Sequence, residues 1–334
     1  ETLALDDNAS VTMTVAQHEG FSSITAAGNE TVTLSNAGTV SGDSNVETYV
    51  LADGTNTFTA ADGGQSVVGG TGADDITGGT GADDLSGGGG NDTITGGGGA
   101  DTLTGGAGDD IFKVDAGTDT ITDLSGSDVL KISAGASGDS TVTADYVATS
   151  ATENSGAATL HVAEGIDVDL SSVTSGDSGF TIDASGNSTA SDLTGSQFND
   201  IIIGGASGEI ITGGSGSDTI NTGAGNDTLI YTDGSELSGD SSVDGGSGTD
   251  TVRFTSATAS VDDADFANVA ANSIEAIELT GDGNTSLTLG TSGDAATAGL
   301  TINGADQTAA GSGDTIEVSG MSEAVTINAG SGDD

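Results

Sequence analysis

The sequence predicts an all-β protein in which parallel β-solenoid coils stand in tandem with strand-rich spacers of solenoid or sandwich type. Three observations carry this prediction. A nine-residue pattern of glycine, aspartate and one apolar residue repeats in register over long stretches. The remaining segments alternate Thr and Val with turns of Gly, Asp, Asn and Ser, which is typical of short strands. Proline is absent from all 334 residues, as expected where most backbone N–H groups join strand ladders.

The first repeat block covers residues 51–131 as nine consecutive nonapeptides. Its clearest copies begin at Gly69 and read GGTGADDIT, GGTGADDLS, GGGGNDTIT, GGGGADTLT and GGAGDDIFK. Position 4 is glycine in all nine copies, and position 8 is always apolar. Position 6 holds an amide in the first two copies (Asn56 and Gln65) and aspartate in the others. Agreement at three positions over this length argues against the disorder that low hydrophobicity and high charge would otherwise indicate.

A second, less regular block covers residues 195–253. It reads GSQFNDIII, GGASGEIIT, GGSGSDTIN and TGAGNDTLI, and after a five-residue slip one more copy, GGSGTDTVR, occupies 245–253. Residues 329–334 (AGSGDD) match the first six positions of a further repeat, so we expect the natural chain to continue.

The predicted organisation follows from these blocks. It comprises a strand-rich N-terminal segment, a first roll, a strand-rich spacer, a second roll, another strand-rich spacer and the start of a truncated repeat. These segments are 1–50, 51–131, 132–194, 195–253, 254–328 and 329–334. Within them, 261–275 is the one stretch that we expect to form a short helix.

Each nonapeptide divides into a turn and a strand. The G-G-x-G-x-D part suits a tight turn, because glycine tolerates positive φ and close backbone approach. The D-x-U-x part, where U is apolar, suits a short strand whose apolar side chain points inward. Two nonapeptides then form one coil of 18 residues, and successive coils stack at the strand spacing of about 4.8 Å.

This stacking brings acidic side chains 18 residues apart into columns. Two bare carboxylates about 5 Å apart repel by roughly 0.8 kcal/mol even in water. A Ca²⁺ ion between coils would reverse the sign, because it takes six to eight oxygen ligands, which carboxylates and turn carbonyls can supply. The same-side pairs predict about seven Ca²⁺ sites. They are Asp74–Asp92, Asp92–Asp110, Asp110–Asp128, Asp83–Asp101, Asp101–Asp119, Asp200–Asp218 and Glu209–Asp227.

The predicted ligand set adds Asp250 and the backbone carbonyls of the glycine turns. The carbonyl donors include Gly70, Gly72, Gly79, Gly81, Gly88, Gly90, Gly97, Gly99, Gly106, Gly108, Gly214, Gly216, Gly223 and Gly225. One apolar side chain per nine residues gives a thin core. Its burial, worth about 25 cal/mol per Å², cannot offset the ordering of so much glycine. We therefore expect folding to be linked to calcium binding.

The charge balance excludes several classes of partner. Three basic residues against 52 acidic ones give a formal net charge of −49, which repels nucleic acids and anionic membrane surfaces. The sequence has no apolar run long enough for a transmembrane helix. Cysteine is absent, which excludes disulfides, thiolate nucleophiles and cysteine zinc sites.

Catalytic motifs are not found, and we predict that the chain is not an enzyme. Glu19 follows His18, but Ser22 stands where an H-E-x-x-H motif has its second histidine. We interpret His18 and His161 as polar residues on half-exposed strands. Neither a G-x-S-x-G elbow nor a P-loop lysine is present. The basic residues, all at position 9 and expected to neutralise nearby acidic groups, are Lys113, Lys131 and Arg253.

The two blocks resemble the calcium-binding nonapeptide repeats of the RTX family, and the segment 114–133 is similar to the usual exit from such a block. The resemblance implies calcium-bound parallel β-rolls, export by type I secretion and folding outside the calcium-poor cytosol. RTX proteins include toxins, proteases, lipases, adhesins and S-layer proteins. The phrases SIEAIELTGDGNTSLTLG and AGLTINGADQ are similar to modules of large bacterial S-layer and surface proteins.

These features favour a structural segment of a secreted bacterial cell-surface protein that folds and self-assembles on binding calcium, as an S-layer or surface filament. Two alternatives stay open. One is the calcium-stiffened stalk of an RTX adhesin, and the other is the C-terminal secretion and folding module of an RTX hydrolase or toxin. The expected partners are Ca²⁺, further copies of the chain and cell-surface glycan. The expected location is extracellular.

Overall fold

The computed structural model describes residues 1–270, 273–281, 283–290, 296–304, 313–319, 324–328 and 330. The repeat start predicted at 329–334 lies outside the described residues except for Gly330. The chain divides into two compact units. The N-terminal unit comprises Glu1–His161 and Ser172–Ser178, and the C-terminal unit comprises Val162–Ser171 and Gly179–Asp334.

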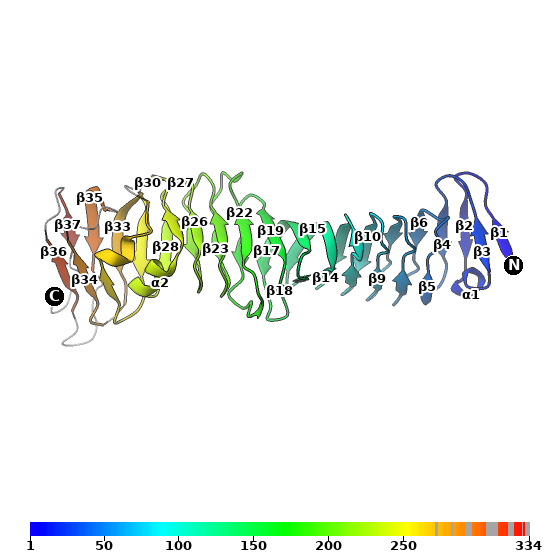
Figure 1. The fold of residues 1–334 in the computed structure, drawn as a ribbon, viewed down its shortest axis with the longest axis horizontal. Coiled ribbons are helices and arrows are strands. Elements are labelled where there is room, and N and C mark those ends of the chain that lie inside the picture. Colours follow the sequence, from blue (N-terminus) through cyan, green and yellow to red (C-terminus); the bar gives the residue numbers. More distant parts are fainter. Residues whose placement is uncertain are drawn as a thin grey trace. The chain divides into compact units, whose positions relative to one another are not determined.

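The N-terminal unit is built from two parallel sheets between which the chain alternates (Figure 1). One sheet contains, in spatial order, β2 (Ser10–Met13), β4 (Thr31–Leu34), β6 (Thr48–Val50), β8 (Ser66–Val68), β10 (Asp84–Gly89), β13 (Thr102–Ala107), β15 (Ala116–Gly126) and β17 (Ser137–Val147). The other contains β5 (Thr39–Ser41), β7 (Thr57–Thr59), β9 (Asp75–Thr77), β11 (Thr93–Thr95), β14 (Ile111–Val114), β16 (Val129–Ile132), β18 (Glu153–Asn154) and β21 (Ser175–Gly176). Smaller elements are β1 (Thr2–Ala4), β3 (Ser23–Thr25), β12 (Gly98–Gly99), β19 (Ala157–Val162) and the helix α1 (Val15–His18).

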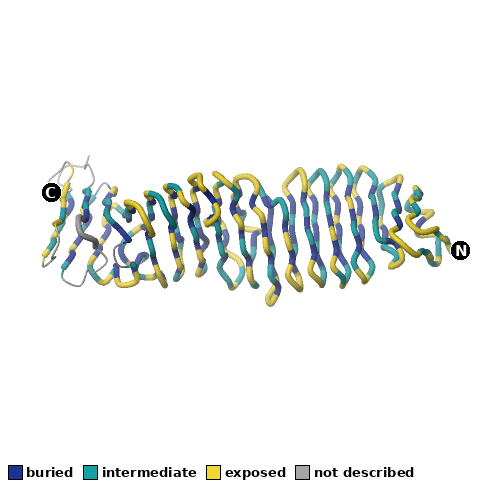
Figure 2. The backbone as a smooth tube through the Cα atoms, turned by 90° about the horizontal axis from the view of Figure 1, so that it is seen from above, coloured by how far each residue is buried: buried dark blue, intermediate teal, exposed yellow. Residues whose placement is uncertain are grey.

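The register of these sheets confirms the 18-residue coil. Ile94 on β11 pairs with Ile76 on β9 and with Phe112 on β14, and all three side chains are fully buried. The position-8 residues of neighbouring coils therefore stack on one another inside the solenoid. Figure 2 shows the result, because buried segments recur at corresponding places in successive coils while many turns are exposed.

The C-terminal unit is also a parallel solenoid. One ladder contains β22 (Phe180–Asp183), β24 (Ile201–Ile203), β26 (Thr219–Asn221) and β29 (Ser242–Asp244). The other contains β20 (Val168–Asp169), β23 (Asp192–Thr194), β25 (Ile210–Thr212), β28 (Thr228–Tyr231), β31 (Thr251–Phe254), β33 (Ile274–Leu279), β35 (Ala296–Asn303) and β37 (Thr326–Asn328). Further strands are β27 (Ala224–Gly225), β30 (Ser247–Gly248), β32 (Ser260–Asp262), β34 (Ser286–Leu289) and β36 (Thr315–Val318). Of the two spacer types expected, the described strands form the solenoid type.

The helices differ from the sequence prediction. In the described part of 261–275, the one helix is a 3₁₀ helix, η1 (Asp263–Phe266), and strand β33 (Ile274–Leu279) follows. The helix α1 was not predicted, and it begins at a capping box in which Thr14 and Gln17 satisfy each other's backbone N–H groups. A second unpredicted helix, α2 (Gly234–Gly239), fills the five-residue slip of the second block. The coil is therefore 23 residues long here, and Ile220 pairs with Val243.

The turn glycines explain which repeat positions are restricted. Gly88 at position 2 has a φ of +104°, and a methyl group there would collide with the carbonyl oxygen of Gly70 in the preceding coil. Gly89 at position 3 would place a methyl group in open space, which is why Thr71 and Thr80 are accommodated at the same position. The close approach of the coils therefore selects glycine at specific turn positions.

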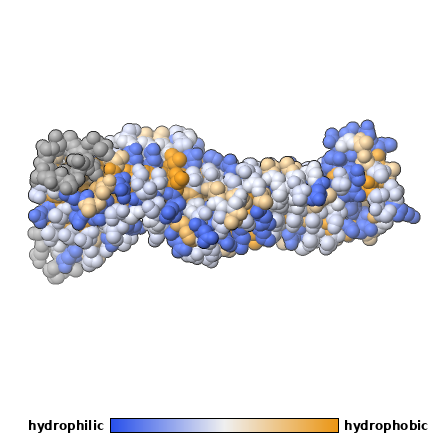
Figure 3. Space-filling model, in the orientation of Figure 1, coloured by the Kyte–Doolittle hydropathy of each residue, from blue (hydrophilic) through white to orange (hydrophobic). Residues whose placement is uncertain are grey.

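One face of the first repeats shows few strongly hydrophilic side chains. On the face drawn in Figure 3, the rungs from β8 to β14 are mostly pale, as glycine and threonine dominate this stretch of sequence. Within the described ranges, no helix combines the length and the apolar character that a bilayer crossing needs.

The two neighbouring glycines provide a matched test of coil stacking. We expect Gly88→Ala to reduce the free energy of unfolding by about 1–3 kcal/mol, because it adds both positive-φ strain and a backbone collision. Gly89→Ala should change it by less than about 0.5 kcal/mol. Urea unfolding of both variants in calcium-containing buffer checks this, and equal losses for the two variants would contradict the stacking argument.

Candidate metal centre

The position-6 acids of the first block form two columns of hydrogen-bonded rungs. In each rung, the backbone N–H of one acid donates to Oδ1 of the acid 18 residues later. The N–Oδ1 distances are 2.7 Å for Asp74–Asp92, 2.8 Å for Asp92–Asp110, 2.8 Å for Asp110–Asp128, 2.8 Å for Asp83–Asp101 and 3.1 Å for Asp101–Asp119. The structure thus brings together all five residue pairs that the spacing predicts for this block.

The second block repeats this geometry and continues it further. The predicted pairs Asp200–Asp218 and Glu209–Asp227 each have an N–Oδ1 distance of 2.8 Å. Asp250 also joins a column, because its Oδ1 accepts the N–H of Asp227 at 2.9 Å. The rungs therefore cross the register slip that α2 introduces.

Four further acids form rungs of the same kind and were missed by the sequence prediction: Glu30, Glu47, Asp240 and Glu275. Asp240 accepts the N–H of Asp218 at 3.1 Å, and Glu275 accepts that of Asp250 at 2.8 Å. Glu30 lies in the sequence GNETV (28–32), which has the G-x-D-x-U pattern with glutamate in place of aspartate. A search of the sequence that allowed glutamate at the aspartate position would therefore have found Glu30.

The columns contain buried carboxylate oxygens that accept no hydrogen bond. Their residues are at most 2 % exposed. Because an ionised carboxylate loses its hydration on burial, an oxygen without a partner in this setting is costly. Among the described residues, seven such oxygens lie at repeat positions: Oδ2 of Asp92, Asp101, Asp119, Asp218, Asp227 and Asp250 and Oε1 of Glu209.

The amide of Asn56 occupies the corresponding place in the first coil and indicates what these oxygens lack. Its Nδ2 lies 2.8 Å from the carbonyl oxygen of Ala52, 2.9 Å from that of Gly54 and 2.9 Å from Oδ1 of Asp74. Ala52 and Gly54 are positions 2 and 4 of their nonapeptide. The nitrogen therefore bridges two turn carbonyls and a carboxylate of the next coil, which are the groups that a cation would bridge in the later coils.

The predicted glycine carbonyls lie in the turns beside these columns. A methyl group on Gly90 would meet the carbonyl of Gly72, and one on Gly97 would meet that of Gly79, so these carbonyls point toward the next coil. In the C-terminal unit, the carbonyl of Gly223 faces Gly246 in the same way. The carbonyls of Gly79 and Gly223 also accept backbone N–H groups of the next coil, from Gly98 at 2.9 Å and from Ser247 at 3.0 Å, so a cation would share these oxygens with the sheet ladder.

The available donors fit a hard divalent cation. They are carboxylate and carbonyl oxygens, which Ca²⁺ prefers, and no thiol exists in the chain. Among the described residues, no group of three or more acidic or histidine side chains is placed to hold a metal. A bound cation would therefore use a carboxylate pair from adjacent coils and complete its shell with turn carbonyls and water.

A family comparison agrees with this geometry. Residues 59–94, 86–121, 185–220, 204–235 and 237–255 match the family described as the RTX calcium-binding nonapeptide repeat. These segments are RTX calcium-binding repeats. No curated protein matches the chain, and no solved structure matches it. The matched segments contain the column acids from Asp74 to Asp119 and from Asp200 to Asp250. Four acids lie outside the match: Glu30, Glu47, Asp128 and Glu275.

The RTX columns have unusual proton affinities in the absence of metal. Burial raises the pKa of Asp119 to about 7, and the charge of Asp101 adds to the shift, while the N–H of Asp101 opposes it. Burial likewise raises the pKa of Asp110 to about 6, that of Glu209 to about 7 and that of Asp218 to about 8. Without a bound cation, these carboxylates therefore ionise at a higher pH than exposed aspartate or glutamate does.

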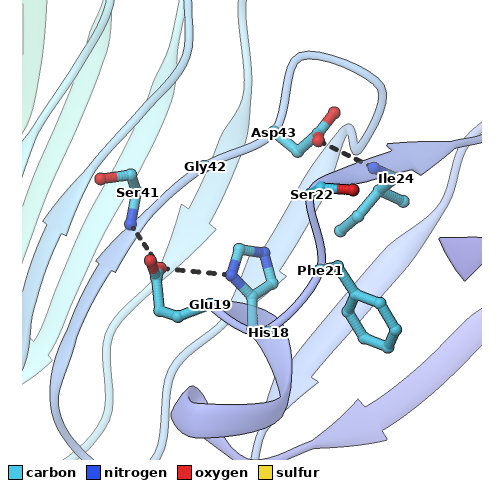
Figure 4. Close-up of a pocket in the computed structure, with 8 residues that line it drawn as sticks. All are labelled: His18, Glu19, Phe21, Ser22, Ile24, Ser41, Gly42 and Asp43. Carbon is cyan, nitrogen blue, oxygen red and sulfur yellow. Dashed lines mark hydrogen bonds and ion pairs between the residues drawn. The ribbon is translucent and has the colours of Figure 1, made fainter. Parts of the chain in front are cut away.

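A pocket near the N-terminus gathers the other polar residues considered for catalysis (Figure 4). It has a volume of about 120 Å³ and is lined partly by His18, Glu19 and Ser22. His18 is buried on α1, so the interpretation of a half-exposed strand residue was wrong. Its Nε2 lies 3.0 Å from Tyr49 Oη, and its Nδ1 lies 3.4 Å from Glu19. Because the Ser22 hydroxyl donates to the carbonyl of Glu1, these contacts hold α1 and the first coil in place rather than activate a nucleophile.

The remaining histidine and the basic residues follow the prediction more closely. His161 lies on β19 with its side chain 48 % exposed, 3.0 Å from Oδ1 of Asp139. Lys113 pairs with Lys131 across adjacent coils, as expected for two position-9 residues in an 18-residue coil. Arg253 forms an ion pair with Glu278 at 2.8 Å. The expected neutralising role is thus seen for Arg253.

The raised pKa values predict that calcium-free protein is more stable in acid. The unfolded pKa of these carboxylates is near 4, and the folded values reach about 6–8. The folded state therefore binds more protons, and its stability is fully present below about pH 4 and is lost as pH rises through 6–8. We expect metal-free protein to keep its β-structure at pH 5 and to lose it at pH 8, as measured by circular dichroism. Greater metal-free stability at pH 8 than at pH 5 would contradict this.

The Asn56 geometry predicts that one substitution adds a metal site. Asn56→Asp should raise the number of bound Ca²⁺ ions by one, because it replaces the bridging amide with a carboxylate. It should also lower stability in calcium-free buffer. Asn91→Asp is the matched control, since Asn91 is exposed and its Oδ1 accepts the N–H of Asp109. Equilibrium calcium binding should show an extra ion for the first variant and none for the control.

Proposed function

We propose that this chain is a structural, non-catalytic segment of a secreted bacterial cell-surface protein that folds on binding Ca²⁺ and assembles with further copies into an S-layer or surface filament. The observation that carries the proposal is the pair of columns of buried carboxylate oxygens without hydrogen-bond partners. The proposed ligands are the position-6 acids predicted from the sequence, together with the carbonyls of their turns.

The charge of the chain supports calcium-linked folding. Three basic residues cannot neutralise 52 acidic ones, and the columns place carboxylates on adjacent coils. Each Ca²⁺ would replace a repulsion between two carboxylates with two attractions and would supply ligand bonds that the thin core cannot match. Calcium thus contributes folding free energy directly.

The same linkage supports an extracellular location. In a calcium-poor compartment the repulsion in the columns would keep the repeats unfolded, and an unfolded chain is suited to passage through a type I secretion channel. RTX proteins are typically secreted, and calcium outside the cell would then complete the fold. An extracellular location therefore fits a chain that folds only where calcium is plentiful.

The charge that calcium leaves uncompensated supports assembly. Seven Ca²⁺ ions would neutralise 14 of the 49 net negative charges and leave about −35. Surfaces this acidic repel one another unless cations bridge them, so contacts between copies would also depend on calcium. The similarity of residues 273–290 to S-layer modules makes a lattice or filament the favoured form, with cell-surface glycan as a further partner.

Removal of calcium tests the folding part of the proposal. At pH 8 we expect the β-sheet signal in circular dichroism to disappear on addition of EGTA and to return with excess Ca²⁺. Excess Mg²⁺ serves as the control and should not restore it, because Mg²⁺ demands a small octahedral site. An unchanged signal in EGTA would refute calcium-linked folding.

Electron microscopy of the purified protein tests the assembly part. An ordered lattice or fibre that forms with calcium and dissolves in EGTA is the expected result. Separate monomeric particles at all calcium concentrations would instead favour the stalk of an adhesin. Assemblies that persist after calcium removal would show that calcium does not hold the copies together.

A further inference from the structure

The N-terminal segment contains a fully buried acid outside the matched repeats. Glu30 immediately precedes β4 and is 0 % exposed. Its Oε1 accepts the N–H of Asn8 at 3.0 Å, whereas its Oε2 is buried and accepts no hydrogen bond. An ionised carboxylate in this state requires a compensating positive charge or a proton.

A second carboxylate lies beside it in the next coil. Glu47 precedes β6, and the pairing of Thr31 with Thr48 places Glu30 and Glu47 at equivalent points of adjacent coils. The N–H of Glu30 donates to Oε2 of Glu47 at 2.8 Å. This is the rung geometry of the RTX columns, formed across a coil of 17 residues by two glutamates.

The surrounding charges are negative. Burial is the largest cause that raises the pKa of Glu30. The side-chain hydrogen bond with Glu47 and the charges of Glu47 and Asp7 raise it further, and the N–H of Asn8 lowers it. The lysines of this unit, Lys113 and Lys131, lie on β14 and β16 of the other sheet. No lysine or arginine side chain is therefore positioned to balance the pair.

We propose that Glu30 and Glu47 hold one further Ca²⁺ ion, at a site that the nonapeptide match does not include. The proposal rests on the same cation chemistry as the proposed function. Two carboxylates supply the charge, and carbonyl oxygens and water complete the shell. The longer glutamate side chains suit a coil whose length departs from the 18-residue repeat.

This site is separate from the columns of the first roll. Between Glu47 and Asp83 the column position is held by Gln65, whose Nε2 donates to the carbonyls of Asp43 and Val46. The amide fills this step without a metal, just as Asn56 does in the other column. The glutamate pair therefore forms a rung of its own, one coil before the step that Gln65 fills.

The competing explanation is a proton shared by the two carboxylates. The Glu30→Gln variant distinguishes a bound Ca²⁺ ion from a shared proton. Glutamine keeps Oε1 as acceptor for Asn8 and offers an N–H to Glu47, so it reproduces the protonated pair.

We measure calcium stoichiometry of the full chain at pH 8 by flow dialysis, and far-UV circular dichroism verifies folding. The control is Asp53→Asn, where an exposed carboxylate accepts the N–H of Thr71 at 3.1 Å.

The expected result is that Glu30→Gln loses one Ca²⁺ ion and that Asp53→Asn loses none. Unchanged stoichiometry in Glu30→Gln, with unchanged or greater stability in calcium-free buffer, would show a shared proton and overturn the proposal. If Glu30→Gln does not fold, Glu47→Gln provides the same comparison from the other side of the pair. Wild-type protein that binds no calcium would instead refute the proposed function itself.

Discussion

The stacking of acidic side chains in a column with one rung per coil is the constraint on which the rest of the structure depends. The coils approach so closely that the N–H of one acid donates to the carboxylate of the next, at 2.7–3.1 Å in the first block. That approach requires glycine in the turns, buries the carboxylates and leaves their second oxygens without partners. The sheets and the thin apolar core are possible only if this charge is compensated.

The protein contains two means of compensation. In the first coils of the roll, Asn56 and Gln65 place amide N–H groups against turn carbonyls and need no metal. In the later coils, aspartate removes these donors and leaves acceptors facing one another. Under the proposed function, the amide coils need no cation, whereas the carboxylate coils need a cation or a proton, although both have the same backbone geometry.

This division suggests how the solenoid is ordered. Under the proposed function, we expect the amide coils to form first, because parallel coils extend from a neighbour more readily than they form alone. We expect the carboxylate coils to add to them when calcium binds. Because each coil contacts mainly its neighbours, the cost of a missing ion is confined to the adjacent rungs.

Much of this could be predicted from the repeat period. A nine-residue pattern with glycine, aspartate and an apolar residue at constant positions determines the 18-residue coil, the inward side chains and the pairing of Asp92 with Asp110. The structure confirms two consequences of this period. Position-8 residues of adjacent coils pair, and so do Lys113 and Lys131. Local spacing is sufficient here because each coil repeats the geometry of the one before it.

Where coil length changes, the sequence alone was insufficient. The places of Asp240 and Glu275 depend on coils of 22 to 25 residues, in which helix α2 and longer turns return the chain to the column. His18 was assigned to a strand because its burial against Tyr49 arises from a contact 31 residues away. The sequence by itself thus determined the period and the chemistry of the columns. Only the tertiary structure decided which carboxylate oxygens remain unpartnered, because hydrogen bonding in the turns depends on how neighbouring coils meet.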